Sequence, residues 1–507
     1  MYIIGIDIGT GSTKAVALDE HGNTLISAQI PYPTLSPGPG LSEQDPEVIW
    51  AAFTKCVARI TTSLSIPPEA IALSSAMHSL ICVSETGQPL ANMITWADNR
   101  SAEVAGKLKN SPLGKKLYAE TGTPVHAMAP LCKLLWMKEN DAELFGKTAK
   151  FISIKEYCWF RMFSKFETDY SIASATGLFD INRCKWHADA LELVGINDSR
   201  LSTPENTSFF RSGIKETVAV EMNLPSSTKV VIGGSDGCLA NVGSFATEPG
   251  IAALTIGTSG AIRVAGHTAA VDVEFMPFNY RLDEKTFISG GPINNGGAAL
   301  KWYAESILQR TLSSEADYEA ILKPAESVPP GSDGLVFLPY IQGERAPIWN
   351  SDTCGVFFGI TSRHKQIHFT RAVLEGITFS LFQIARSLKK SGLDIFEIRV
   401  SGGFVKSKFW VQLLADIFGK RVRLASGDDA SAIGAAMIAM KALGMTTPAE
   451  NGSHSIVFDP DPEAHEVYMQ RTFPMYENLY KALVGEMKTF HENRTESTDT
   501  LQHSSLK

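Results

Sequence analysis

Two stretches that lie about half a chain apart carry residues suited to binding a phosphate chain. Residues 2–19 (YIIGIDIGTGSTKAVALD) and 254–264 (LTIGTSGAIRV) each show a β-branched run, a Gly-Thr turn and a second extended run. This pattern predicts a hairpin rather than a strand, a loop and a helix. Glycines in such turns let backbone amides converge on a phosphate, and the hydroxyls of Thr10, Ser12 and Thr258 add donors.

Asp7 stands at the lip of the first turn. A carboxylate beside phosphates is repulsive unless a divalent cation lies between them, so we expect Asp7 on the magnesium side. Either turn alone could be an ordinary tight hairpin. Two copies favour two related domains that each give a phosphate loop to one nucleotide. The common motif G-x-x-x-x-G-K-[ST] is absent, and residues 9–14 read G-x-G-x-x-K.

Residues 229–243 (KVVIGGSDGCLANVG) predict a strand, a glycine turn that carries Asp236, and a helix that starts near Cys238. A carboxylate on a turn at the C-terminal end of a strand is well placed to act as a general base. Asp is also a preferred helix N-cap residue, and the two roles are compatible.

The same turn matches G-x-S-x-G, the signature of a serine hydrolase, with Ser235 as the nucleophile. That alternative needs a later histidine, for which His364, His368 and His454 are available. It leaves both phosphate turns unexplained, so it is the weaker interpretation.

Polar residues also follow two further predicted strands. His78 comes shortly after the strand 70–75, and Arg100 precedes a helix that begins at 101. Ligands of α/β folds lie at such strand ends. A satisfied core histidine and a surface cation at a helix start are the alternative interpretations.

These groups must be positioned by two series of strands and helices, which predict an α/β chain. A helix over 47–63 has Asp45 as its N-cap, and a strand over 396–400 ends at Gly402 and Gly403. The paired glycines offer either a flat backbone surface for an adenine ring or a simple turn. We predict domains over 1–247 and 248–507, the second with a helix around 462–492 and a polar tail.

The composition is that of a soluble globular enzyme, with 44% hydrophobic and 20% charged residues among 507. A net charge of −8 without a Lys/Arg cluster argues against nucleic acid or a membrane surface as a partner. The seven cysteines form no C-x-x-C pair, no apolar run reaches membrane-spanning length, and a buried-looking strand begins at residue 2. We therefore expect reduced thiols in a cytoplasmic protein without a signal peptide.

The chain resembles the FGGY family of carbohydrate kinases over roughly residues 2–445. Two family patterns are met in full, at 128–140 (MAPLCKLLWMKEN) and 355–375 (GVFFGITSRHKQIHFTRAVLE). The stretches GIDIGTGSTK, GGSDG, TIGTSG, QGERAP and SGGFVKS follow in family order. The resemblance implies two actin-like (ribonuclease H-like) ATPase domains, with ATP and a sugar in an interdomain cleft.

Within the family, the stretches 94–102, 121–134 and 401–404 look most like gluconate kinases. The resemblance therefore favours ATP-dependent phosphorylation of D-gluconate to 6-phospho-D-gluconate. Xylulose kinases share a Met-His pair like Met77-His78, so xylulose or another sugar is the alternative. Glycerol kinases carry Gln at the position of Gly237, so we do not expect glycerol to be the acceptor. A non-catalytic ATP-driven switch on the same fold is a third class, and it would need no base at Asp236.

The resemblance also implies a role for each matching residue. Asp236 is the catalytic base, Asp7 holds magnesium, and the pair His78 and Arg100 suits a substrate carboxylate. Phe404 stands where many relatives have a small residue and narrows the expected adenine slot. Homodimers are common in the family. The sugar contacts are Met77, His78, Asp98, Arg100, Met128 and Asp236, and the nucleotide contacts are Thr10, Gly11, Lys14, Thr258, Gly260, Asn295, Gly297, Gly402, Gly403 and Ser407.

Overall fold

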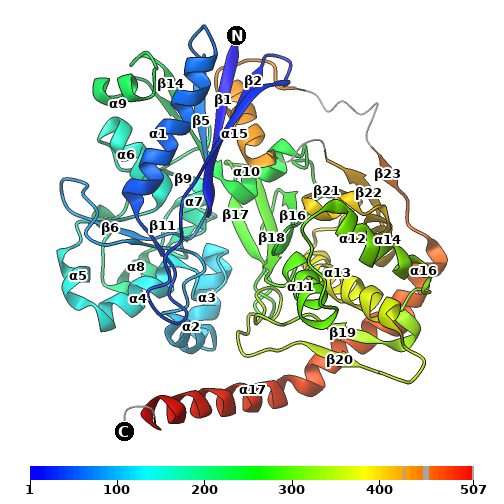
Figure 1. Cartoon of the computed structure of the whole chain (residues 1–507). Coiled ribbons are helices and arrows are strands. Elements are labelled where there is room, and N and C mark those ends of the chain that lie inside the picture. The colour runs from blue at the N-terminus through cyan, green and yellow to red at the C-terminus, as the bar shows by residue number, and fades with distance from the viewer. Residues whose placement is uncertain (426–428, 449–455, 505–507) are drawn as a thin grey trace. The chain divides into compact units, whose positions relative to one another are not determined.

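The computed structural model of the chain describes residues 1–425, 429–448 and 456–504 (Figure 1). Tertiary contacts divide it into two compact units, each with its own sheet, which confirms two α/β domains. Within the described residues, no helix is both long and apolar enough to cross a bilayer. Unit 1 comprises Met1–Pro249, Val264–Ser289 and Gly427–Gly452, and unit 2 comprises Gly250–Arg263, Gly290–Ser426 and Ser453–Lys507.

The sheet of unit 1 runs in the order β3-β2-β1-β5-β14-β13. Strand β1 pairs antiparallel with β2 and parallel with β5, which confirms the first predicted hairpin. In the hairpin register Asp7 lies opposite Lys14. The strand bounds are β1 Tyr2–Ile8, β2 Ser12–Asp19, β3 Thr24–Pro31, β5 Ala70–Ser75, β13 Phe210–Arg211 and β14 Lys229–Ser235.

Side chains alternate along β1 and so build two hydrophobic cores. Ile4, Ile6 and Ile8 pack with α1 (Pro46–Ser63), α6 (Ile154–Phe163) and α9 (Glu216–Glu221). Ile3 packs on the opposite face with α10 (Asp236–Gly243) and α15 (Ala430–Ala442). The predicted cap of α1 is confirmed, because the Asp45 carboxylate accepts the amide of the second helical residue.

Helix α15 comes late in the chain and packs on the first sheet because glycine makes room for it. A Cβ on Gly5 would lie 1.8 Å from the carbonyl oxygen of Ala432. At the crossing of α10 and α15, a Cβ on Gly434 would lie 2.0 Å from the carbonyl oxygen of Leu239. Both helices therefore reach backbone contact with their neighbours on this face of unit 1.

The second sheet runs in the order β17-β18-β16-β15-β21-β22-β23, with β17 at Phe278–Arg281, and from β18 onward it repeats this plan. β15 and β16 are neighbours across the second Gly-Thr turn, β15, β21 and β22 are parallel, and β23 is antiparallel. The duplication predicted from the two turns is thus present in the topology. The bounds are β15 Ile251–Ile256, β16 Gly260–Gly266, β18 Phe287–Ile293, β21 Glu397–Ser401, β22 Arg421–Leu424 and β23 Val457–Phe458.

The remaining elements complete the two units around these sheets. Helix α17 continues to Ser504, past the helical stretch predicted to end near 492, and residues 505–507 of the predicted polar tail lie outside the described residues. The shorter elements of unit 1 are β4 Glu43–Gln44, β6 Ile81–Val83, β7 Met93–Ile94, α2 Ala102–Lys109, α3 Pro112–Thr121, α4 Pro130–Asn140, α5 Ala142–Lys147, β8 Lys150–Ile152, β9 Glu167–Asp169, α7 Tyr170–Ser174, β10 Phe179–Asp180, β11 Lys185–Trp186, α8 Ala188–Val194, β12 Thr203–Glu205 and β17 Phe278–Arg281. The remaining elements of unit 2, which include the long helices α13 and α17, are α11 Gly297–Trp302, α12 Glu315–Leu322, β19 Val336–Leu338, β20 Val356–Phe358, α13 Gln366–Lys390, α14 Lys408–Phe418, α16 Pro462–Val467 and α17 Phe473–Ser504.

Candidate active site

The first Gly-Thr turn, at residues 9–11, joins β1 to β2 and has an open tip. Thr10 is held on two sides, because its carbonyl accepts from Gln44 Nε2 (2.6 Å) and its hydroxyl from Trp96 Nε1 (2.9 Å). Gly11 is exposed, and a Cβ there would meet no atom within 4 Å. The turn therefore combines a fixed backbone with free space in front of Gly11, which a phosphate contact requires.

Asp7 ends near this turn as a half-buried carboxylate beside other negative charges. Burial and the charge of Asp236 raise the pKa of Asp7 to about 7, although Ser74 Oγ donates to its Oδ1 (2.8 Å) and opposes the shift. Lys14, opposite Asp7 on β2, forms an ion pair with Asp429 just before α15. The Lys14 ammonium, for which the sequence predicts a phosphate contact, is thus paired with an internal carboxylate in this structure.

The environment of Asp7 fits the predicted magnesium ion. Mg²⁺ prefers oxygen ligands, keeps several waters and takes one or two carboxylates. Within residues 1–425, 429–448 and 456–504, no group of three or more His, Cys, Asp or Glu side chains could hold a metal by itself. Asp7 supplies one carboxylate of the kind that Mg²⁺ takes together with water and phosphate oxygens.

Asp236 is the first residue of α10, directly after β14. A register shift around Gly233, whose φ is +63°, makes the strand bulge before it reaches the acid. Ser235 provides the helix cap that the sequence assigned to Asp236, because its Oγ accepts the amide of Cys238 (3.4 Å). The Asp236 carboxylate is half-buried, and its Oδ1 accepts the amide of Gly237 (2.6 Å). The acid thus stands at a strand end with its carboxylate partly exposed.

Ser235 is not presented as a nucleophile. The residue is fully buried, its Oγ serves the cap, and its amide donates to Ser171 Oγ (2.7 Å). His364 and His368 contact residues of unit 2, and His454 lies outside the described residues. The hydroxyl of Ser235 therefore has a structural role, and the serine hydrolase interpretation loses its nucleophile.

A buried ion pair lies next to the Asp236 turn. Lys155 and Asp169 contact each other at 1% and 0% side-chain exposure. Asp169 also accepts the amide and the hydroxyl of Ser171, at 2.9 and 2.5 Å. Because Ser171 Oγ accepts the amide of Ser235, a continuous polar chain joins the ion pair to the residue before Asp236.

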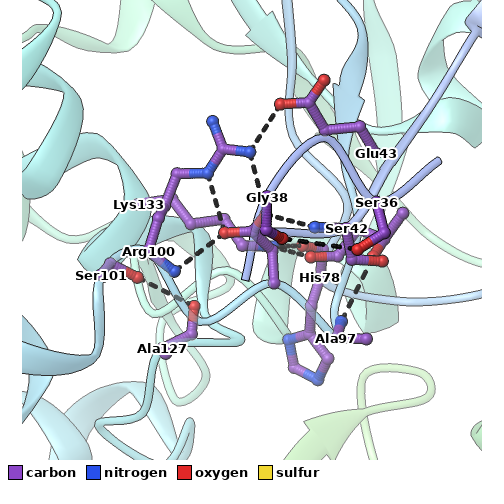
Figure 2. Close-up of polar contacts among 12 residues, drawn as sticks. Ser36, Gly38, Ser42, Glu43, His78, Ala97, Arg100, Ser101, Ala127 and Lys133 are labelled. Atoms are coloured by element: carbon purple, nitrogen blue, oxygen red, sulfur yellow. Dashed lines mark hydrogen bonds and ion pairs between the residues drawn. The ribbon is translucent and has the colours of Figure 1, made fainter. Parts of the chain in front are cut away.

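Two predicted sugar residues, Asp98 and Arg100, form one cluster with Glu43. Figure 2 shows the contact between Arg100 and Glu43. Arg100 donates from Nε and Nη2 to Asp98 (2.8 and 2.9 Å) and from Nη2 to Glu43 (2.6 Å), and its guanidinium lies 5.3 Å from the ring centre of Trp136. Burial by itself raises the pKa of Asp98, but hydrogen bonds from Arg100 and the Ser42 amide outweigh it and lower the pKa. Asp98 is fully buried, and these contacts keep it in its ionised form.

His78 is held from three sides in a strained backbone conformation, with φ of +65°. Its Nδ1 lies 2.7 Å from the carbonyl oxygen of Ala175, so we assign the ring proton to Nδ1. Nε2 then accepts from Tyr280 OH (3.1 Å), and the His78 carbonyl accepts from Lys133 Nζ (2.5 Å). Both ring nitrogens therefore contact other residues of the protein. The predicted role of His78 and Arg100, a cationic pair that binds a substrate carboxylate, stays a prediction.

The two predicted methionines lie in unit 1 as well. Met77 is partly exposed and packs against the core between the sheet, α10 and α15. Met128 is buried just before α4, next to Ala127, whose carbonyl accepts from Ser101 Oγ (3.1 Å). This bond links the Met128 segment to the residue that follows Arg100.

Three polar residues of this region escaped the sequence analysis: Glu43, Lys133 and Ser171. Lys133 had a readable signal, because it interrupts the apolar run 131–135 (LCKLL) of a predicted helix, and a lysine there must find buried partners. Glu43 lies on β4 and Ser171 on α7, in stretches that the sequence predicts as polar loops, and neither had such a signal. Their roles depend on partners that are distant in the sequence.

Unit 2 contains a cavity of about 1040 Å³, lined in part by the predicted nucleotide residues Thr258, Gly297, Gly403 and Ser407. A Cβ on Gly403 would meet no atom within 4 Å, so its backbone faces open space. Gly402 supports this turn instead, since its φ is +99° and a Cβ would lie 2.6 Å from a backbone oxygen. The cavity is large enough for a nucleotide.

Other predicted nucleotide residues have internal partners. Among the described residues, Gly260 and Asn295 do not line the cavity. Asn295 is fully buried and donates to Gly343 O (2.7 Å) and to Glu344 (3.1 Å). Burial raises the pKa of Glu344 to about 7, although several donors oppose the shift. Phe404 also lines the cavity, and its predicted effect on an adenine ring stays a prediction.

Several known proteins are similar to this chain in both sequence and fold. The models for the FGGY family of carbohydrate kinases match residues 2–243 (N-terminal domain) and 252–443 (C-terminal domain). A gluconokinase from Bacillus subtilis (strain 168) is 40% identical over 454 residues, which are 87% of this chain and 88% of that protein. The crystal structures of a gluconate kinase and of a ligand-bound xylulose kinase, both from Lactobacillus acidophilus, each give a TM-score of 0.91. Their identities are 35% and 34%, and each comparison covers 96% of this chain and 99% of the other.

Proposed function

The chain belongs to the FGGY family of carbohydrate kinases, and we propose that it uses ATP to convert D-gluconate to 6-phospho-D-gluconate. The observation that carries the chemistry is the half-buried Asp236 carboxylate at a strand end, within electrostatic reach of Asp7. A base and a cation site side by side are what phosphoryl transfer to an alcohol requires. A nucleotide switch has no use for the base.

Asp236 acts as the general base in this proposal. Its carboxylate accepts the proton of the terminal hydroxyl as that oxygen attacks the γ-phosphorus of ATP in line. The new P–O bond forms as the bond to the β-phosphate oxygen breaks, and ADP leaves. Such general-base help contributes about 10²- to 10⁴-fold, and positioning and electrostatics supply the rest.

The nucleotide contacts follow from both Gly-Thr turns and from the cavity of unit 2. Gly403 and Ser407 flank the adenine, Gly297 lies near the ribose or phosphates, and Thr258 reaches the phosphates. Thr10 and Gly11 of the first turn are proposed as further phosphate contacts. Magnesium, held through Asp7 and water, would neutralise phosphate charge. Asn295 binds residues 342–344 through internal hydrogen bonds, and Gly260 is the first residue of β16 after the second turn.

The acceptor assignment rests on the gluconokinase and gluconate kinase relatives and on Arg100. Arg100 uses Nε and Nη2 for its contacts with Asp98 and Glu43, which leaves Nη1 for a substrate carboxylate. D-xylulose is the alternative acceptor, because the xylulose kinase structure is as similar in fold. The carboxylate, which xylulose lacks, is what separates the two substrates.

The test is an ADP-release assay with ATP and magnesium and a panel of D-gluconate, D-xylulose, L-ribulose, glycerol and no sugar. Turnover with gluconate alone supports the proposal. Turnover with an uncharged sugar keeps the kinase chemistry and removes the gluconate assignment. ATP binding without turnover of any sugar contradicts both.

A cytoplasmic location and a homodimeric state belong to the same proposal. They follow from the family resemblance and from the composition. Cell fractionation tests the first, and sedimentation of the purified protein tests the second.

A further inference from the structure

Lys133 is a lysine whose side chain is completely buried in unit 1 (0% exposed). It lies on α4, and its ammonium donates to His78 O (2.5 Å), both residues being labelled in Figure 2, and to Thr95 O (2.8 Å). Burial lowers the pKa of Lys133 to about 7, although the carboxylate of Asp98 opposes the shift. Burying an amine costs free energy, and the two hydrogen bonds offset that cost.

The two carbonyls belong to segments that are paired at one point and then separate. Leu80 and Ile94 exchange both backbone hydrogen bonds, at 3.0 and 2.9 Å. One residue further, the Thr95 amide turns away and donates to Ser42 O (3.0 Å). Lys133 joins the two segments at this point, where the strand-like pairing no longer does so.

The first of these segments is also strained. His78 adopts a left-handed backbone conformation, which a residue with a Cβ holds only when its surroundings fix it. Ala175 and Tyr280 fix its ring, and Lys133 fixes its carbonyl. Without the carbonyl contact the turn could relax and move Met77, the residue before it.

We propose that Lys133 is a positioning residue of the acceptor site, which fixes the His78 and Thr95 segments relative to each other. This inference rests on the proposed function, because it takes the residues around His78 and Arg100 as acceptor contacts. Lys133 does not itself touch the sugar, since its side chain is closed off from solvent. Its loss weakens acceptor binding and leaves ATP binding and proton transfer to Asp236 nearly unchanged.

The test compares Lys133→Met, which keeps the length of the aliphatic chain but removes all donors, with Lys133→Gln, which keeps two N–H donors without the charge. We expect Lys133→Met to raise the acceptor KM roughly 10- to 100-fold, because two buried carbonyls lose their donor. Lys133→Gln should raise it less, and the KM for ATP should stay within about twofold in both. The matched control is Lys150→Met. Lys150 lies on β8 and donates to Leu201 O (2.7 Å), so this variant should leave both KM values unchanged.

A folded Lys133→Met variant with an unchanged acceptor KM would overturn the proposal. Equal increases in the KM for acceptor and for ATP would overturn it as well, because they indicate general loosening. If Lys133→Met does not fold, hydrogen exchange of the wild type decides. Acceptor should then protect residues 76–80 and 94–100 together, and protection of one segment alone contradicts the inference.

Failure of the proposed function is recognised separately. If the wild type phosphorylates another sugar instead of gluconate, the same KM comparison is made with that sugar. If it phosphorylates none, hydrogen exchange without acceptor compares the wild type with Lys133→Gln and Lys150→Met. Faster exchange of both segments in Lys133→Gln, but not in Lys150→Met, supports the positioning role. Unchanged exchange in Lys133→Gln refutes it.

Discussion

Replacing Asp236 with asparagine should separate catalysis from binding and folding. The change is isosteric, and the amide oxygen can still accept the Gly237 amide that now bonds Oδ1 at 2.6 Å. The lost proton acceptor predicts a kcat about 10²- to 10⁴-fold lower, or about 2.7 to 5.4 kcal/mol of transition-state stabilisation. ATP binding should persist, because the nucleotide cavity is built from residues of unit 2.

The same change should not destabilise the protein. The charge of Asp236 helps to raise the pKa of Asp7 to about 7, from 3.8. Because the pKa of Asp7 is raised in the folded state, Asp7 stabilises the fold only while it is protonated, and this contribution is lost as the pH rises through 7. At pH 8 the ionised Asp7 carboxylate therefore opposes folding. Asp236→Asn removes part of that repulsion, and the variant should unfold at the same temperature as the wild type or higher at pH 8.

Steady-state ADP release with saturating sugar and ATP measures the kcat, and calorimetric titration measures ATP affinity. The matched control is Asp141→Asn, which changes an aspartate that caps α5 (Leu144 amide to Oδ1, 3.2 Å). A kcat for Asp236→Asn within tenfold of the wild type would refute the base assignment. Loss of ATP binding would show instead that Asp236 serves the nucleotide.

Three further predictions concern the surroundings of the site. Asp169→Asn leaves the Lys155 ammonium buried without its counter-charge and should lower the free energy of unfolding by about 3–5 kcal/mol. Adding Lys155→Met should recover most of this loss. A double variant that is as unstable as Asp169→Asn in thermal unfolding would contradict the ion-pair assignment. Burial raises the Glu344 pKa from 4.5 to about 7, so the wild type should lose about 3 kcal/mol of stability relative to Glu344→Gln as the pH rises from below 4.5 to above 7. A stability difference between the two proteins that stays constant across this range in urea unfolding would contradict the raised pKa. Gly403→Leu fills open space on the cavity wall and should raise the KM for ATP at least about tenfold without changing the acceptor KM, whereas Gly402→Ala should lower thermal stability because of its φ of +99°.

Local patterns allowed much of the fold to be predicted. The turns at 9–11 and 257–260 join neighbouring strands, Asp45 caps the helix that follows it, and Asp236 stands at a strand end. The cap of α10 was assigned one residue late, because Ser235 and Asp236 are both good cap residues and only the strand bulge decides which one faces the helix amides.

The partners of the site residues could not be predicted in the same way. Lys14 pairs with Asp429, and both ring nitrogens of His78 are taken by residues about 100 and 200 positions away in the sequence. Asn295 is fully buried, and its partners Gly343 and Glu344 lie about 50 positions further along the sequence. No local pattern encodes such contacts.

The sequence by itself determined the duplicated hairpins, the α/β class and the type of chemistry, because strand alternation, glycine turns and caps depend on residues a few positions apart. Tertiary structure alone decided that α15 packs on the first sheet, that Lys133 holds the His78 and Thr95 carbonyls, and which side chains remain open to a ligand. Those outcomes depend on close backbone approach at glycines and on the burial of polar groups that must then find partners. Both are properties of the packed chain, in which residues far apart in sequence become neighbours.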